Sequence, residues 1–330
     1  MVLRLKNVIT RRTAILTLSL LCGLMATACS MTSVGYSLAP RLANWEMAKF
    51  VTFAPAQQAL ADQRLARLHE WHRSTQIPDY VGWLDQMVAR LEPLSRLPDH
   101  ETVNPMSTPD AAELAAWRAQ VTARLEPLWQ QLAEPLAQLA LTLTAEQLAD
   151  IEAQLQVRNQ ALQDRIKPSD PLRAAQARLE RWRSRLEFFL GPLTEKQQAR
   201  LAHWLETQEP SAHWWANRLA RQQRMLALLH DTRQQQPPVA QVTPAVLRLL
   251  RDIGEPADPQ VAARRQQRMA QSDQMLAELL AIGTPQQFRH ARDRFAGFAA
   301  DLRAIGDLPD RVAGAATDST AAAIRRLAMR

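Results

Sequence analysis

The stretch QFRHARDRFAGFAADLRAI, residues 287–305, decides the fold class of this chain. Its apolar side chains recur at steps of three and four residues, the spacing that places them in one stripe along an α-helix. Charged residues occupy the other faces, so the stretch predicts an amphipathic helix that packs against other helices and does not span a membrane. The stripe consists of Phe288, Ala291, Phe295, Phe298, Leu302 and Ile305.

Other segments repeat this pattern, and nothing in the chain suggests a sheet. Glycine is scarce, with nine residues in 330, and no run of alternating β-branched residues occurs. We therefore predict an all-α fold, a multi-helix bundle or curved stack of about ten amphipathic helices. Asn159 interrupts one apolar stripe, and we expect it to be a buried polar anchor that hydrogen-bonds a neighbouring helix. The side chains expected in the core include Leu155, Trp182, Leu186, Phe189, Phe295 and Phe298.

Three helix starts are marked by the same four-residue pattern. Thr144, Thr194 and Thr284 each stand three residues before a glutamine. This spacing lets the threonine hydroxyl accept from the backbone N–H of the third helical residue while the glutamine reaches back to the cap, so each pattern predicts a capped helix. Thr108-Pro109 and Thr243-Pro244 predict two more starts, each a cap followed by proline in the first turn, where no donor is lost.

The N-terminus has the three-part layout of a bacterial export signal. Four basic residues precede an apolar run at 14–25, and the small residues 26–28 precede Cys29. Three alternatives fit this layout: a lipoprotein signal with Cys29 acylated after cleavage, ordinary secretory cleavage at the same place, and an uncleaved anchor over the uncharged residues 13–40. We favour acylation of Cys29, because a lone cysteine in an oxidising compartment is otherwise a liability.

This interpretation predicts a cell-envelope protein that is anchored by lipid in the outer membrane and faces the periplasm. Ser30 follows the cysteine, whereas many sorting systems retain lipoproteins in the inner membrane when Asp stands there. The formal net charge of +7 includes the four basic residues of the signal, so the mature chain is near +3. That charge is ordinary for a chain of this size, and no nucleic-acid partner is expected.

The chain divides by composition into six segments. A Gln- and Pro-rich stretch forms the clearest linker, and an Ala-rich tail ends the chain. The predicted segments are a signal peptide at 1–28, a tether at 29–44, a Trp-rich helical domain at 45–233, the linker at 234–243, C-terminal helices at 244–308 and the tail at 309–330.

Signatures of catalysis and of metal binding are absent from the sequence. No glycine-rich phosphate loop, nucleophile elbow or His-Glu-x-x-His pair occurs, so no catalytic residue, metal or cofactor is predicted. His69 and His72 lie one helical turn apart, but without a third ligand nearby we expect surface or half-buried side chains. Arg178, Arg181 and Arg185 share one helical face. This face is either solvated or a surface for anionic lipid head groups or an acidic envelope protein.

Several motifs together resemble a known family. They are Trp45–Phe53 with Gln57, Trp71-His72-Arg73 leading to Ile77-Pro78-Asp79-Tyr80, Leu143-Thr144 with Gln147, Arg181-Trp182, Leu190-Gly191 leading to Gln197, and Trp214-Trp215. In these motifs the chain resembles the DUF6279 proteins, bacterial lipoproteins of unknown function, over residues 29–305. The resemblance implies an all-helical domain behind a lipobox cysteine, and it implies no particular activity.

We therefore expect a protein that binds rather than one that catalyses. The first hypothesis is an interaction or structural protein of the envelope. The alternative is a periplasmic carrier that binds an apolar or anionic ligand in a groove between helices. An exposed apolar or Arg-rich face would favour the first hypothesis, an aromatic-lined cavity would favour the carrier, and clustered His, Asp and Glu in a cleft would favour an enzyme.

Overall fold

The structure is a computed structural model that describes residues 35–166, 171–208, 213–254 and 258–307. In this part of the chain every regular element is helical and no strand occurs, which confirms the predicted all-α class. None of the described helices is long and apolar enough to cross a membrane. The helices are α2 (Ala39–Ala48), α3 (Pro55–Trp71), the π-helical segment η1 (His72–Gln76), α4 (Ile77–Ser95), the short 3₁₀ segment η2 (Pro105–Ser107), α5 (Ala111–Ala123), α6 (Glu126–Thr142), α7 (Ala145–Ile166), α8 (Pro171–Leu190), α9 (Glu195–Thr207), α10 (His213–Gln235), α11 (Val239–Gly254), α12 (Pro259–Ala281) and α13 (Pro285–Gly306).

Four buried glutamines show that the chain is built as two similar halves. Gln57 and Gln147 donate to each other's side-chain oxygen over 2.9 and 2.7 Å, and Gln197 and Gln287 do the same over 3.0 and 2.8 Å. The members of each pair are 90 residues apart, and the second pair follows the first by 140 positions. Each glutamine also accepts from the N-cap backbone N–H of its own helix.

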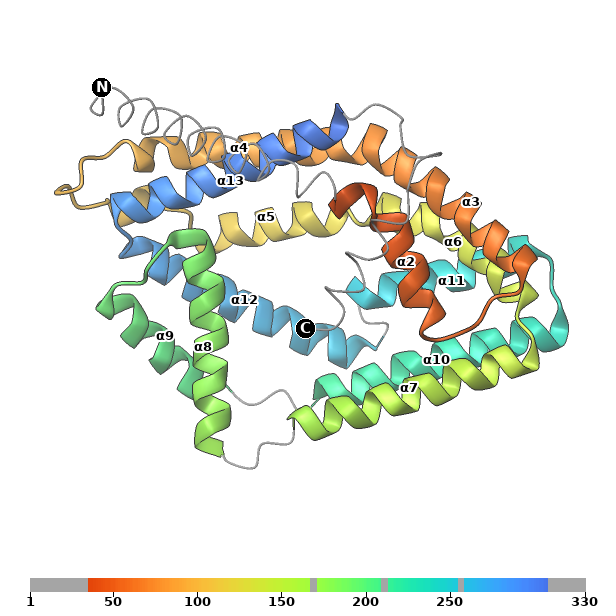
Figure 1. Cartoon of the computed structure of the whole chain (residues 1–330). Coiled ribbons are helices and arrows are strands. Elements are labelled where there is room, and N and C mark those ends of the chain that lie inside the picture. The colour runs from red at the N-terminus through yellow and green to blue at the C-terminus, as the bar shows by residue number, and fades with distance from the viewer. Residues whose placement is uncertain (1–34, 167–170, 209–212, 255–257, 308–330) are drawn as a thin grey trace, which may run out of the picture.

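The two halves interlock through equivalent helix pairs. α4 of the first half packs along α13 of the second, and the corresponding pair is α10 with α7. The pairs α6 with α11 and α12 with α5 also join one half to the other. Figure 1 shows α4 and α13 along one edge of the molecule and α7 and α10 along the opposite edge.

The hydrophobic core lies at these junctions between the halves. One cluster joins Leu91 of α4 to Leu201 of α9 and to Phe288 of α13, whose side chain is 1% exposed. A second cluster joins Leu148, the counterpart of Phe288 in the first half, to Leu229 of α10. Each half therefore buries its apolar stripes against the other half, and hydrophobic burial holds the two together.

The expected core residues lie in three kinds of environment. Leu155 and Leu186 are buried, as predicted, and Trp182, Phe295 and Phe298 are half-buried. Phe189 is 40% exposed, so the prediction that its side chain is buried is wrong. On α8 the core side is formed by Leu186 and Leu190, whereas the ring of Phe189 lies against the rings of Phe188, Phe295 and Phe298.

Two of the predicted helix starts are wrong. α5 begins after Asp110, whose carboxylate accepts from the Glu113 N–H over 2.8 Å, so Asp110 and not Thr108 is the cap. Thr243 lies inside α11, where its hydroxyl donates to the Val239 carbonyl over 2.9 Å. In both places an alternative local hydrogen bond competes with the predicted cap.

The linker predicted at 234–243 is shorter in the structure. α10 runs to Gln235 and α11 begins at Val239, so three residues connect them. Gln236 turns the chain with φ of 45°, in the left-handed region that non-glycine residues seldom adopt. Val242 and Val246 pack against α6, and this burial extends the helix through the predicted linker.

Candidate functional site

The predicted arginine face is only partly free to meet a partner. Arg178 of α8 donates to the Leu205 carbonyl over 2.6 Å and to the Gln208 carbonyl over 3.2 Å, at the C-terminal end of α9. Arg181 and Arg185 are exposed on the same helix. Arg178 therefore caps α9, and the three arginines do not form one surface that is free to bind a partner.

Asn159 is half-buried on α7 and hydrogen-bonds across to α10. Its side chain exchanges hydrogen bonds of 2.7 and 3.2 Å with Gln222, and its oxygen also accepts from Arg218 over 3.1 Å. The residue thus joins the two halves and lines no described cavity. Cys29, the signal peptide and the Ala-rich tail lie outside the described residues, whereas part of the predicted tether forms α2.

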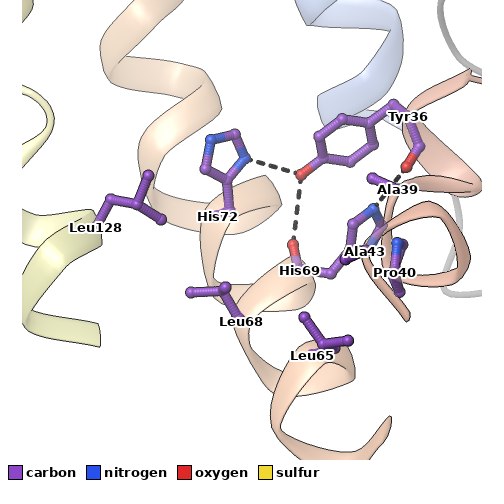
Figure 2. A pocket seen from close by; sticks show the side chains of 9 residues that line it. All are labelled: Tyr36, Ala39, Pro40, Ala43, Leu65, Leu68, His69, His72 and Leu128. Carbon is purple, nitrogen blue, oxygen red and sulfur yellow. Dashed lines mark hydrogen bonds between the residues drawn. The ribbon is translucent and has the colours of Figure 1, made fainter. Parts of the chain in front are cut away.

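His69 and His72 come together with Tyr36, a partner that the sequence did not reveal. The Tyr36 hydroxyl lies 2.9 Å from Nδ1 of His72 and 3.4 Å from the His69 carbonyl, and Nε2 of His69 lies 3.0 Å from the Tyr36 carbonyl. Figure 2 shows the hydroxyl between the His72 ring and the His69 carbonyl. We name these three residues the Tyr36 latch, because they hold the start of the described chain against α3.

Tyr36 and His72 are each held in the neutral form. Burial raises the pKa of Tyr36 to about 12. Burial, with the nearby His69, lowers the pKa of His72. Proton transfer from the hydroxyl to the imidazole is disfavoured from both sides, so the pair is suited to a hydrogen bond and not to acid–base chemistry. Among the described residues no group of three His, Cys, Asp or Glu could hold a metal ion.

A small apolar cavity adjoins the latch. It has a volume of about 240 Å³ and is lined by side chains of α2, α3 and α6 besides the latch itself. Residues 72–76 form a π-helical turn in which the Ser74 hydroxyl donates to the Glu70 carbonyl over 2.9 Å. Such turns insert a residue into a helix and redirect the side chains around it. Here the turn contains His72 at the point where it meets Tyr36.

A larger apolar groove opens between α4, the end of α5 and α13. Its volume is about 510 Å³, within the range typical of ligand sites. We call it the α4–α13 groove. The His72 ring contacts the ring of Tyr80, which lines the groove, with 5.5 Å between the ring centroids. The lining side chains are Tyr80, Trp83, Leu84, Val121, Arg124, Leu125, Phe298, Asp301 and Leu302.

The polar groups of this groove carry little free charge. Two charged residues line the groove. Nε of Arg124 lies 2.8 Å from a carboxylate oxygen of Asp79, so this cation is paired, and the Asp301 carboxylate is not free either. Burial raises the pKa of Tyr80, which keeps its hydroxyl neutral. The indole N–H of Trp83 is shielded from water, and the described residues offer it no acceptor. The groove is therefore suited to the apolar part of a ligand.

Exposed aromatic rings continue the groove across α13. Phe298, which lines the groove, stacks on Phe188 of α8 with 6.1 Å between ring centroids. Phe188 is 44% exposed, and the Arg294 guanidinium lies 3.8 Å from its ring centroid. Exposed apolar surface that extends over several helices is typical of an interaction site.

The tyrosine and tryptophan residues that the first half contributes to the groove and the latch have no aromatic counterparts in the second half. The residues 140 positions after Tyr80 and Trp83 are Ala220 and Gln223, and the counterpart of Tyr36 is Gln176. The buried glutamines, by contrast, are present in both halves. The repeated features are those that hold the scaffold, and the unrepeated aromatic residues form the candidate site.

Comparison with known proteins finds one family. Residues 49–253 match a family model described as a family of unknown function, DUF6279. The match covers α4 and α5 of the groove and ends before α13. No curated protein and no solved structure matches significantly.

Proposed function

Since the chain belongs to the DUF6279 family, whose function is unknown, we propose its role from its own site: it is a lipid-anchored envelope protein that binds an apolar ligand in the α4–α13 groove. The observation that carries this proposal is the open groove of about 510 Å³ between α4 and α13, lined by aromatic and aliphatic side chains. Covering such a surface removes apolar area from water, which contributes about 25 cal/mol per Å².

The anchor is Cys29, acylated after removal of residues 1–28 and placed in the outer membrane on the periplasmic side. The basic, apolar and small-residue order ahead of Cys29 supports this proposal. Intact-mass analysis of detergent-extracted protein tests it, and we expect an N-terminal Cys29 with attached acyl chains. An unmodified N-terminus, or a chain that still begins at Met1, would contradict it.

Binding, and not catalysis, is the task that the geometry favours. In the Tyr36 latch, burial raises the pKa of Tyr36 and lowers the pKa of His72, so this bonded pair is held neutral. Arg124, the cation that lines the groove, is paired with Asp79. Of the two binding hypotheses, the aromatic-lined groove favours a ligand that binds between helices. The arginine face is a weaker candidate, because Arg178 already caps α9.

Site-specific photo-crosslinking in intact cells tests the groove. A photo-crosslinking residue in place of Val121 lies on the rim of the groove, where the native side chain is 43% exposed. The matched control replaces Val157, which is 62% exposed on α7 at the opposite edge of the molecule. We expect a discrete adduct from position 121 only, weakened when Cys29→Ala removes the anchor. Equal or absent adducts at the two positions would refute the proposed groove.

A further inference from the structure

We infer that the occupant of the α4–α13 groove is the acyl chain of a phospholipid, drawn from the membrane to which the protein is anchored. This inference rests on the proposed function, because it takes the groove as the binding site and Cys29 as the anchor. The structure contributes three observations: where the tether meets the folded chain, which residues separate that point from the groove, and what chemistry the groove presents.

The tether reaches the folded chain at Tyr36. The hydroxyl and carbonyl of this residue are bonded to His72 and His69, and its ring lies 4.4 Å from the His69 ring, centroid to centroid. Cys29 stands seven residues earlier. An extended chain spans at most about 3.6 Å per residue, so acylated Cys29 keeps Tyr36 within about 25 Å of the bilayer surface.

The groove lies next to that attachment point. The Tyr36 ring contacts the His72 ring at 5.8 Å, and the His72 ring contacts the Tyr80 ring at 5.5 Å. Tyr80 belongs to the groove lining, so only two ring contacts separate the attachment point from the groove. A short tether therefore holds the groove beside the bilayer, which presents hydrocarbon chains at high local concentration.

The lining suits a hydrocarbon chain with a polar end. Leu84, Val121 and Leu302 supply aliphatic walls, while Tyr80 and Trp83 are the residue types that proteins place at the boundary between hydrocarbon and water. Arg124 is paired with Asp79, so recognition falls on the chain more than on the charge of the head group.

A binding assay with palmitate as the probe tests the inference. Equilibrium dialysis uses the full mature chain carrying Cys29→Ser, so that no attached lipid competes. We expect Val121→Glu to weaken palmitate binding at least about tenfold, because it places a carboxylate on the apolar rim. Val157→Glu adds the same charge on the exposed face of α7 and should leave binding unchanged, and Val121→Leu should preserve it. Equal binding by Val121→Glu and Val157→Glu, or no binding by the unmodified groove, would overturn the inference.

The adduct formed in cells separates this inference from the proposed function. A phospholipid mass on the adduct from position 121 supports both. A protein adduct at that position, together with a lack of palmitate binding, would leave the groove as a binding site and refute its lipid occupant. An adduct to the protein's own Cys29 lipid would likewise refute a phospholipid occupant. Loss of every adduct at position 121 would refute both.

Discussion

At the residue scale, each buried glutamine joins a helix start to a neighbouring helix turn. Gln287 accepts from the Thr284 N–H over 3.1 Å, donates to the Pro192 carbonyl over 2.8 Å and pairs with Gln197. Gln197 is fully buried, so water cannot replace the hydrogen bonds that its amide would lose with Gln287. Such a group costs more than the hydrogen bond itself contributes.

We expect Gln287→Ala to lower the free energy of unfolding by about 2–4 kcal/mol, because it removes the hydrogen bonds that Gln287 makes to Gln197, Thr284 and Pro192. Gln286→Ala, one residue earlier and exposed, should change stability by less than about 0.5 kcal/mol. Urea unfolding measures both variants. In the double variant Gln197→Ala/Gln287→Ala the cost should be smaller than the sum of the single costs. A double variant whose cost equals the sum of the two single costs would contradict the proposed coupling between Gln197 and Gln287.

His72 makes the free energy of unfolding depend on pH, and this free energy decreases as the pH falls below 6.5. Its pKa is lowered in the folded protein, so above the ordinary value of 6.5 both states are neutral and its contribution is complete. As the pH falls below 6.5, the unfolded chain takes up the proton first, and stability decreases until the folded pKa is passed. His72→Gln keeps an acceptor for the Tyr36 hydroxyl but does not titrate.

We therefore expect His72→Gln to flatten the loss of stability between pH 7 and pH 5, measured by urea unfolding at several pH values. His100→Gln replaces an exposed histidine and serves as the control, with a pH dependence like that of the unmodified protein. A slope unchanged by His72→Gln would show that His72 does not titrate differently in the folded state.

At the scale of the elements, the C-terminal end of α9 depends on an arginine from another helix. Arg178 of α8 supplies two hydrogen bonds to the last carbonyls of α9, at Leu205 and Gln208. The unpaired carbonyls at a helix end carry partial negative charge, which a guanidinium offsets. Arg181 and Arg185 lie on the same helix without this role.

We expect Arg178→Gln to lower stability by about 1 kcal/mol, because two charge-assisted hydrogen bonds are lost at a half-exposed site. Arg181→Gln and Arg185→Gln remove the same charge from exposed positions and should each change stability by less than about 0.5 kcal/mol. Thermal or urea unfolding of the three variants compares them directly. Three equal effects would mean that net charge, and not the α9 cap, accounts for the change.

Local elements could be predicted from the sequence, whereas their pairing could not. The capping boxes at Thr194 and Thr284 form as predicted, because their hydrogen bonds join residues three positions apart. The burial predicted for Phe189 is wrong, because the exposure of its side chain depends on how α8 packs against α13. The Tyr36 latch joins residues more than 30 positions apart, and no periodicity reports such a contact. The candidate groove was missed for the same reason.

At the scale of the whole molecule, the repeated threonine–glutamine pattern indicated more than helix caps. Gln147, Gln197 and Gln287 are visible in the sequence, but the fourth member, Gln57, follows Ala54 and lacks the threonine. The complete set shows two halves whose helices pack mainly across the boundary, α4 against α13 and α7 against α10. We therefore expect the two halves to fold and unfold together.

We expect neither half, 35–166 or 171–307, to fold alone, because each loses the partner that buries its apolar stripes. A protease site inserted within 167–170 allows the two to be cut after folding, and the cut halves should stay associated. Circular dichroism and size-exclusion chromatography follow both outcomes. A half that unfolds by itself in one cooperative transition would contradict the interlocked architecture.

The central proposal is that a short tether holds the α4–α13 groove against lipid, and the environment of Val121 tests it most directly. With Cys22 removed in the signal and Cys29 acylated, Val121→Cys would supply a single free thiol for a nitroxide label, and Val157→Cys supplies the control. Electron paramagnetic resonance on the protein anchored in phospholipid vesicles compares collisions with oxygen, which concentrates in lipid, and with a water-soluble nickel complex. We expect the label at position 121 to favour oxygen and the label at 157 to favour nickel. A label at position 121 as accessible to nickel as the label at 157 would contradict the proposal.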